Sequence, residues 1–79
     1  MTITKGEFTR FSLNGRMQLL QLYGTIVFQQ PEANNFFIIY KINNFYALAN
    51  LIITKQHYTV RSAEPVTDSI VFAYITNIQ

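Results

Sequence analysis

Several residue types are absent or rare in this chain of 79 residues, and each absence excludes a class of function. There is no cysteine, which excludes disulfide bonds and thiolate metal sites. His57 is the only histidine, so a metal site with two histidine ligands is excluded as well. The three glycines are too far apart to form a phosphate-binding loop. We therefore expect no metal and no cofactor.

Charged residues are also scarce. They make up 13% of the chain, about half their usual share in soluble domains. Asparagine and glutamine take their place, and the net charge is only +2. A weakly charged surface in a chain with 15% aromatic residues is poorly protected against association. We therefore expect a homo-oligomer or a protein with a dedicated protein partner.

Long hydrophobic runs are absent too. The longest, residues 36–40, is far too short to span a bilayer, and residues 1–7 lack the apolar stretch of a secretion signal. No glycine- or serine-rich linker and no internal repeat divides the chain. We therefore expect one domain over residues 1–79, in the cytoplasm and without a membrane partner.

The most informative segment is a β-hairpin over residues 36–53, in which two strand-like runs flank Asn43 and Asn44. Asparagine tolerates the positive φ values of a two-residue type I′ turn, so Ile42 should pair with Phe45. Every other cross-strand pair then follows by counting outward.

This register makes both faces of the hairpin apolar. A sheet covered on one side only should alternate apolar and polar residues, so a second cover is needed: a helix, another subunit or a partner. The first face carries Phe36, Ile38, Tyr40 and Ile42 opposite Phe45, Ala47, Ala49 and Leu51, and the second face carries Phe37, Ile39, Lys41, Tyr46, Leu48, Asn50 and Ile52.

A helix is predicted before the hairpin, over residues 13–23. Ser12 is suited to cap its first turn, its apolar residues fall on one stripe, and Gly24 follows where a left-handed residue would end it. The small residues Ala47 and Ala49 allow a close approach, so we expect this helix to pack on the first face. Residues 25–29 predict a short strand with Ile26 and Phe28 on one side, and residues 31–35 predict a loop.

Residues 54–57 predict a polar connection into a fourth strand over residues 58–63. If Ile53 pairs with Tyr58, then Tyr58 and Val60 lie on the first face, whereas Thr59 and Arg61 lie on the second. Residues 67–78 are ambiguous, because the β-branched residues favour a strand and the capping residues Thr67, Asp68 and Ser69 favour a helix.

We choose a helix for residues 67–78, with an apolar stripe formed by Ile70, Val71, Tyr74, Ile75 and Ile78. The predicted fold is then α+β: a small four-stranded antiparallel meander flanked by an N-terminal and a C-terminal helix.

The end of the predicted helix and two of the predicted strands carry a resemblance to a known family. The residues concerned are Leu19, Leu20, Gly24 and Thr25, together with the tyrosine-led strand around Tyr40 and the Phe-Tyr strand at residues 45–46. The chain resembles a family of short uncharacterised bacterial open reading frames over residues 8–65. Where that family has an acidic residue in the pattern Phe-Tyr-Val-Glu-Val, this chain has Leu48, which makes the second face more apolar. The resemblance implies a fold and carries no known activity.

No set of residues suggests catalysis. His57 lies in a predicted polar loop, and the acidic residues Glu7, Glu32, Glu64 and Asp68 are not spaced to bring two carboxylates together. We expect that the chain is not an enzyme and that it has no catalytic residues.

The second face is the candidate site. Tyr46 opposite Lys41 suits a protein interface, because an aromatic ring is combined with polar ends. We expect a protein-interaction module that associates with itself or acts as an inhibitor or adaptor of another protein. If the C-terminal helix covers this face, the same residues belong to the core. The candidate interface residues are Phe37, Ile39, Lys41, Tyr46, Leu48, Asn50, Ile52 and Arg61.

Two other functions stay open. A weak single-stranded nucleic-acid binder would stack bases on Tyr46 and use Lys41 and Arg61 for the phosphates, although the few cations predict low affinity. A small-molecule cup between helix and sheet is the third possibility.

Overall fold

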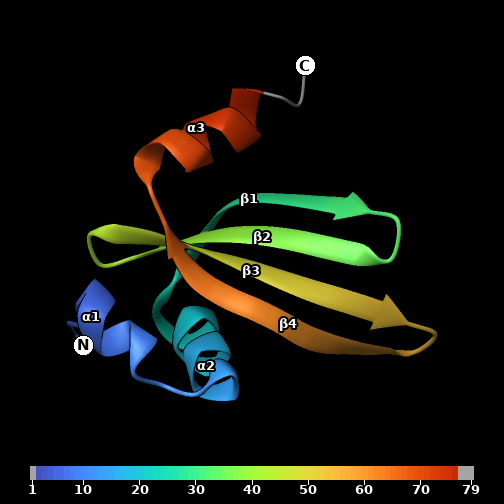
Figure 1. Ribbon diagram of the computed structural model, residues 1–79, viewed down its shortest axis with the longest axis horizontal. Coiled ribbons are helices and arrows are strands. Elements are labelled where there is room, and N and C mark those ends of the chain that lie inside the picture. The colour runs from blue at the N-terminus through green and yellow to red at the C-terminus, as the bar shows by residue number, and fades with distance from the viewer. Residues whose placement is uncertain (1, 77–79) are drawn as a thin grey trace.

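The protein is described by a computed structural model that covers residues 2–76 (Figure 1). Its four strands form one antiparallel sheet in the order β1-β2-β3-β4, so the predicted α+β meander is confirmed. In Figure 1, α1 and α2 lie on one side of the sheet and α3 lies on the other. The elements are α1 (Lys5–Thr9), α2 (Leu13–Tyr23), β1 (Thr25–Glu32), β2 (Asn35–Ile42), β3 (Phe45–Thr54), β4 (His57–Val66) and α3 (Asp68–Thr76).

The predicted register of the central hairpin is confirmed, from Ile42 opposite Phe45 outward to Phe36 opposite Leu51. The turn differs from the type I′ geometry that we expected, because only Asn43 of the asparagine pair has a positive φ, 54°. The Asn43 side chain also donates a hydrogen bond to the backbone oxygen of Ile3, at 2.7 Å. This turn therefore holds the start of the chain against the sheet.

The first face is covered by α2, as the two small residues predicted. Ala47 and Ala49 are fully buried, and so is Ala63, which pairs with Ala49 on the neighbouring strand. Leu20 and Met17 of α2 belong to the same buried cluster. The row of alanines lets the helix approach closely while the larger residues of β2 fill the space beside it.

The N-terminal end of α2 has the predicted cap, whereas its C-terminal end differs from the prediction. Ser12 accepts a hydrogen bond from the Gly15 N–H, as predicted for an N-cap. Gly24 ends the helix with a φ of −88°, so it is not in the left-handed conformation that we expected. A Cβ atom at Gly24 would lie 2.7 Å from the Leu20 carbonyl oxygen and 3.1 Å from the Tyr40 ring, so glycine is needed for close packing.

The short helix α1 was not predicted from the sequence, because five residues are too few to show a helical period. Thr4 and Glu7 form a capping box, and Phe8 is fully buried with its ring 5.5 Å from that of Phe45. Hydrogen bonds with Thr4 lower the pKa of Glu7, so this cap stabilises the fold at neutral pH and is lost as the pH falls through that pKa.

Two β-bulges change the predicted faces. One falls between Ile26, which pairs with Tyr40 on the first face, and Phe28, which pairs with Ile39 on the second. The prediction that Ile26 and Phe28 share one side was therefore wrong. A bulge adds one unpaired residue and reverses the side-chain alternation beyond it.

The second bulge interrupts β4 at Arg61, between Val60 opposite Leu51 and Ser62 opposite Asn50. Ile53 pairs with Tyr58 as predicted, and Val60 keeps its place opposite Leu51. Arg61 has no direct cross-strand partner, so the simple alternation that placed it on the second face does not apply.

The outer strands are longer than predicted. β1 continues through Pro31 to Glu32. Proline has no N–H to donate, but this is tolerated because β1 is an edge strand. The four-residue connection expected at residues 54–57 is a two-residue turn, since Thr54 pairs with His57.

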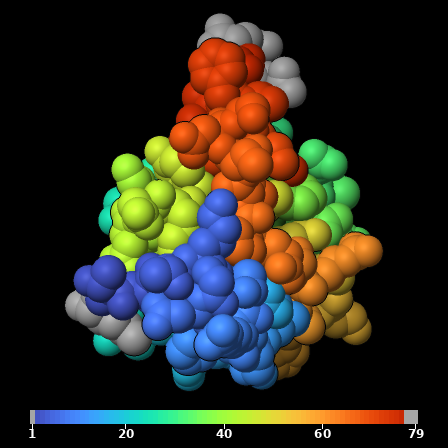
Figure 2. All heavy atoms as spheres, turned by 60° about the vertical axis from the view of Figure 1, so that its left-hand side comes forward, coloured from blue at the N-terminus to red at the C-terminus, as the bar shows by residue number. Residues whose placement is uncertain are grey.

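The choice of helix over strand for the C-terminal segment was correct for Asp68–Thr76, and positions 77–78 of that prediction lie outside the described residues. The backbone oxygen of Thr67 accepts hydrogen bonds from the N–H groups of Ile70 and Val71, which starts the helix. Figure 2 shows that α3 projects from the body of the molecule. Within residues 2–76, none of the helices has the length and apolar character needed to cross a membrane.

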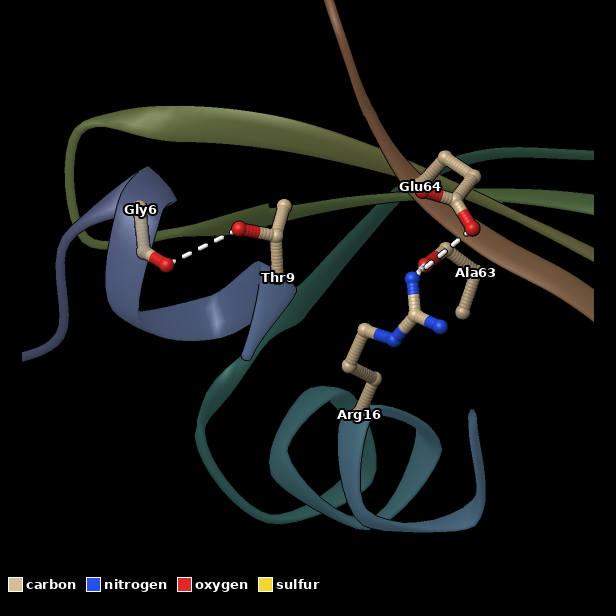
Figure 3. A network of polar contacts seen from close by, with 5 residues as sticks. All are labelled: Gly6, Thr9, Arg16, Ala63 and Glu64. Carbon is tan, nitrogen blue, oxygen red and sulfur yellow. Dashed lines mark hydrogen bonds and ion pairs between the residues drawn. The ribbon is translucent and has the colours of Figure 1, made fainter. Parts of the chain in front are cut away.

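Arg16 joins α2 to the edge strand β4 (Figure 3). Its Nη1 atom donates to the backbone oxygen of Ala63 at 2.9 Å and to the Glu64 carboxylate at 2.7 Å. The Arg16 side chain is only 15% exposed, whereas that of Glu64 is 57% exposed. The bond to the strand carbonyl is therefore better shielded from water than the ion pair.

The alanine row predicts the effect of overpacking. Replacing Ala49 with Phe should lower the free energy of unfolding by about 1–3 kcal/mol, because α2 has no room to accept the ring. Leu22→Phe on the exposed side of α2 is the control and should change it by less than about 0.5 kcal/mol, since Leu22 is 73% exposed. Urea unfolding measures both, and an unchanged midpoint for Ala49→Phe would rule this packing out.

The Arg16 contacts predict a ranking of two variants. Arg16→Met should lower the free energy of unfolding by about 1–2 kcal/mol, because it leaves the Ala63 carbonyl without its donor. Glu64→Gln should cost less than about 1 kcal/mol, because its carboxylate is mostly solvated. If Glu64→Gln proves the more costly change in urea unfolding, the ion pair and not the carbonyl bond holds α2 to β4.

Candidate interaction surface

The second face is divided by α3 into a covered and an uncovered part. Ile39 and Phe28 of the sheet are buried together with Val71 of α3, and we name these three residues the α3 cluster. Tyr74 of α3 places its ring 6.0 Å from Phe28 and 6.4 Å from Phe37. The possibility that the C-terminal helix covers this face is therefore realised for part of it.

The predicted interface residues fall into three groups. Ile39 has no exposed surface, so it is a core residue. Tyr46 and Leu48 are half-buried and pack against the α3 cluster. The remaining members range from half-buried to exposed: Phe37, Asn50 and Ile52 are half-buried, and Lys41 and Arg61 are exposed.

The three residues proposed for nucleic-acid binding are not brought together. The Lys41 ammonium lies 5.6 Å from the centre of the Tyr46 ring, so the protein's own cation occupies one side of that ring. Arg61 lies beside Asn50, which is four positions from Tyr46 along β3, or about 13 Å at the usual rise of a strand.

α3 also exposes apolar side chains on more than one of its sides, which the sequence prediction did not expect. Ile70 is 42% exposed, Phe72 is 69% exposed and Ile75 is 43% exposed. We name these three residues the α3 surface. A signal was present in the sequence, since Phe72 falls outside the predicted stripe and makes the helix apolar on more than one side.

Asn50 is an unusual residue for the centre of the second face. Its Oδ1 atom is shielded from solvent and has no hydrogen-bond donor among the described residues. An unsatisfied buried acceptor costs about 1–3 kcal/mol. Stability alone therefore does not explain an asparagine between Leu48 and Ile52.

The residues considered for catalysis lie apart from one another. His57 opens β4 at the exposed turn, Glu64 pairs with Arg16, and Glu7 caps α1. Within residues 2–76, no three histidine, aspartate or glutamate side chains gather closely enough to hold a metal ion.

Comparisons with known proteins add no relative: no family model matches the chain, and no curated protein or solved structure matches it significantly. The resemblance to short bacterial reading frames therefore stays a hypothesis.

The unpaired acceptor predicts a stabilising substitution. Asn50→Val should raise the free energy of unfolding by about 1 kcal/mol, because it removes the unsatisfied oxygen and adds a β-branched residue to a central strand. Asn50→Asp should lower it, because a charge is costlier to bury than an amide. Urea unfolding of both variants tests this, and a Val variant no more stable than the parent would contradict it.

Proposed function

We propose that this chain is a non-enzymatic protein-interaction module that associates with a second copy of itself through the α3 surface and the adjoining part of the second face. The observation that carries the proposal is the exposure of Ile70, Phe72 and Ile75 on a helix that covers only part of the sheet. Phe37 and Leu48 adjoin this surface, since Phe37 contacts Tyr74 and Leu48 packs on the α3 cluster.

The absence of charge favours a second copy over a different partner. Residues 69–76 carry no charged side chain. In a symmetric dimer the patch packs against its own copy, so a charge close to the two-fold axis would face a like charge. An uncharged patch avoids this repulsion. A role as an inhibitor or adaptor of another protein is the alternative within the same class, and a cytoplasmic location stays a prediction of the sequence.

The nucleic-acid alternative gains no support from the site. Its cations are separated, and the ring of Tyr46 already contacts Lys41. Steep loss of binding with added salt would identify it, because phosphate contacts release counterions.

Two matched variants test self-association. Phe72→Asp should weaken it at least tenfold, because a charge is placed at the centre of an apolar interface. Leu22→Asp is the control: Leu22 is 73% exposed on α2, on the other side of the sheet, and its replacement should leave association unchanged. Sedimentation equilibrium at micromolar concentration measures the molar mass, with circular dichroism to confirm folding.

The parent should sediment at twice 9.2 kDa. A parent protein that stays at 9.2 kDa, or a folded Phe72→Asp variant that associates like the parent, would remove the proposal. A monomeric parent that binds an oligonucleotide, with loss of binding in a Lys41→Ala/Arg61→Ala variant, would replace it with the nucleic-acid function.

A further inference from the structure

The first face also has an uncovered part. α2 covers the end of this face that carries the alanines, and beside α2 the sheet surface near the β3–β4 turn forms a pocket of about 360 Å³. Its walls come from Met17 and Gln21 of α2 and from Phe36, Leu51, Ile53 and Tyr58 of the sheet.

A second hollow of about 320 Å³ continues this pocket along the helix. Both hollows are lined by Met17, Gln21 and Tyr58, so they adjoin each other. Together they form a groove between α2 and the β3–β4 hairpin. Each hollow is at the small end of the range for ligand sites, about 300–1,000 Å³.

The groove has the chemistry of a site for an uncharged molecule. Its lining contains no charged side chain, and apolar residues dominate the larger hollow. The polar groups of that hollow are the Gln21 amide and the phenols of Tyr40 and Tyr58. Burial, and secondarily the nearby Tyr58, raise the pKa of Tyr40.

Exposure at the rim leaves the groove accessible. Tyr58 is 62% exposed and Ile53 is 41% exposed, while Leu51 and Ile38 at the base are buried. A mostly apolar and aromatic lining with a few hydrogen-bonding groups is usual for a small-molecule site.

We propose that this groove binds a small neutral apolar molecule with one hydrogen-bond acceptor, such as an alcohol or a ketone. Its hydrocarbon part contacts Phe36, Leu51 and Ile53, and its oxygen accepts a hydrogen bond from the Tyr58 hydroxyl. A carboxylate is disfavoured, because no cation in the lining compensates for its loss of water. The groove lies on the opposite face of the sheet from α3, so this site is independent of self-association.

Titration with 1-octanol, followed by amide chemical shifts in nuclear magnetic resonance, tests the site directly. We expect saturable shifts at residues 17, 21, 51 and 53, and octanoate of the same chain length should bind at least tenfold more weakly. Repeating the titration on Phe72→Asp keeps the result independent of association state. No saturation, equal binding of octanoate, or shifts confined to α3 would overturn the proposal.

Three tyrosine variants locate the contact. Tyr58→Ala should weaken octanol binding at least tenfold because it removes a wall, and Tyr58→Phe should weaken it several-fold because it removes only the hydroxyl. Tyr23→Ala is the control, since Tyr23 is 50% exposed and does not line the groove. Unchanged binding by Tyr58→Ala would overturn the proposal. A second outcome would also overturn it: the Tyr58→Ala variant no longer forms a dimer, and the parent dimer does not bind octanol. The groove would then hold a second copy of the chain.

Discussion

The structure depends on one constraint: a four-stranded sheet with two apolar faces has to be covered by very little helix. The pairing of Ile42 with Phe45 sets the register, and this register alone makes both faces apolar. The helices available are short, with 11 residues in α2 and 9 in α3. Each covers one end of its face, where the packing is tight, and leaves the other end open. The groove and the α3 surface are both consequences of this shortage.

The parts of the fold that could be predicted are those governed by local pairing. The turn at Asn43 and the unbroken alternation of side chains in the two strands predicted the register of the central hairpin. The small residues Ala47 and Ala49 predicted which face of the sheet α2 covers. The bulges at Val27 and Arg61 could not be predicted, because neither position carries the glycine that often marks a bulge. Each bulge reverses the alternation beyond it, so an error of one residue moved Phe28 to the wrong face.

The candidate site was harder to predict than the fold, because it depends on how α3 sits on the sheet. The sequence identifies a second apolar face, but the helix could have covered any part of it. α3 placed Val71 and Tyr74 against Phe28 and Ile39, which removed Ile39 from the surface and left Phe72 outside. A helix that is apolar on several sides has no single preferred docking face, so its rotation is decided by tertiary packing.

The few charges of the chain serve the fold more than recognition. Of the four acidic residues, Glu7 caps α1, Glu64 pairs with Arg16 across to α2, and Asp68 lies in the first turn of α3. An acidic residue in that position is favourable to the helix dipole. Three of the four acids are thus placed where they position a helix, and both open surfaces are left almost uncharged. Recognition at either surface then rests on shape and apolar contact, for which long-range steering and salt dependence are weak.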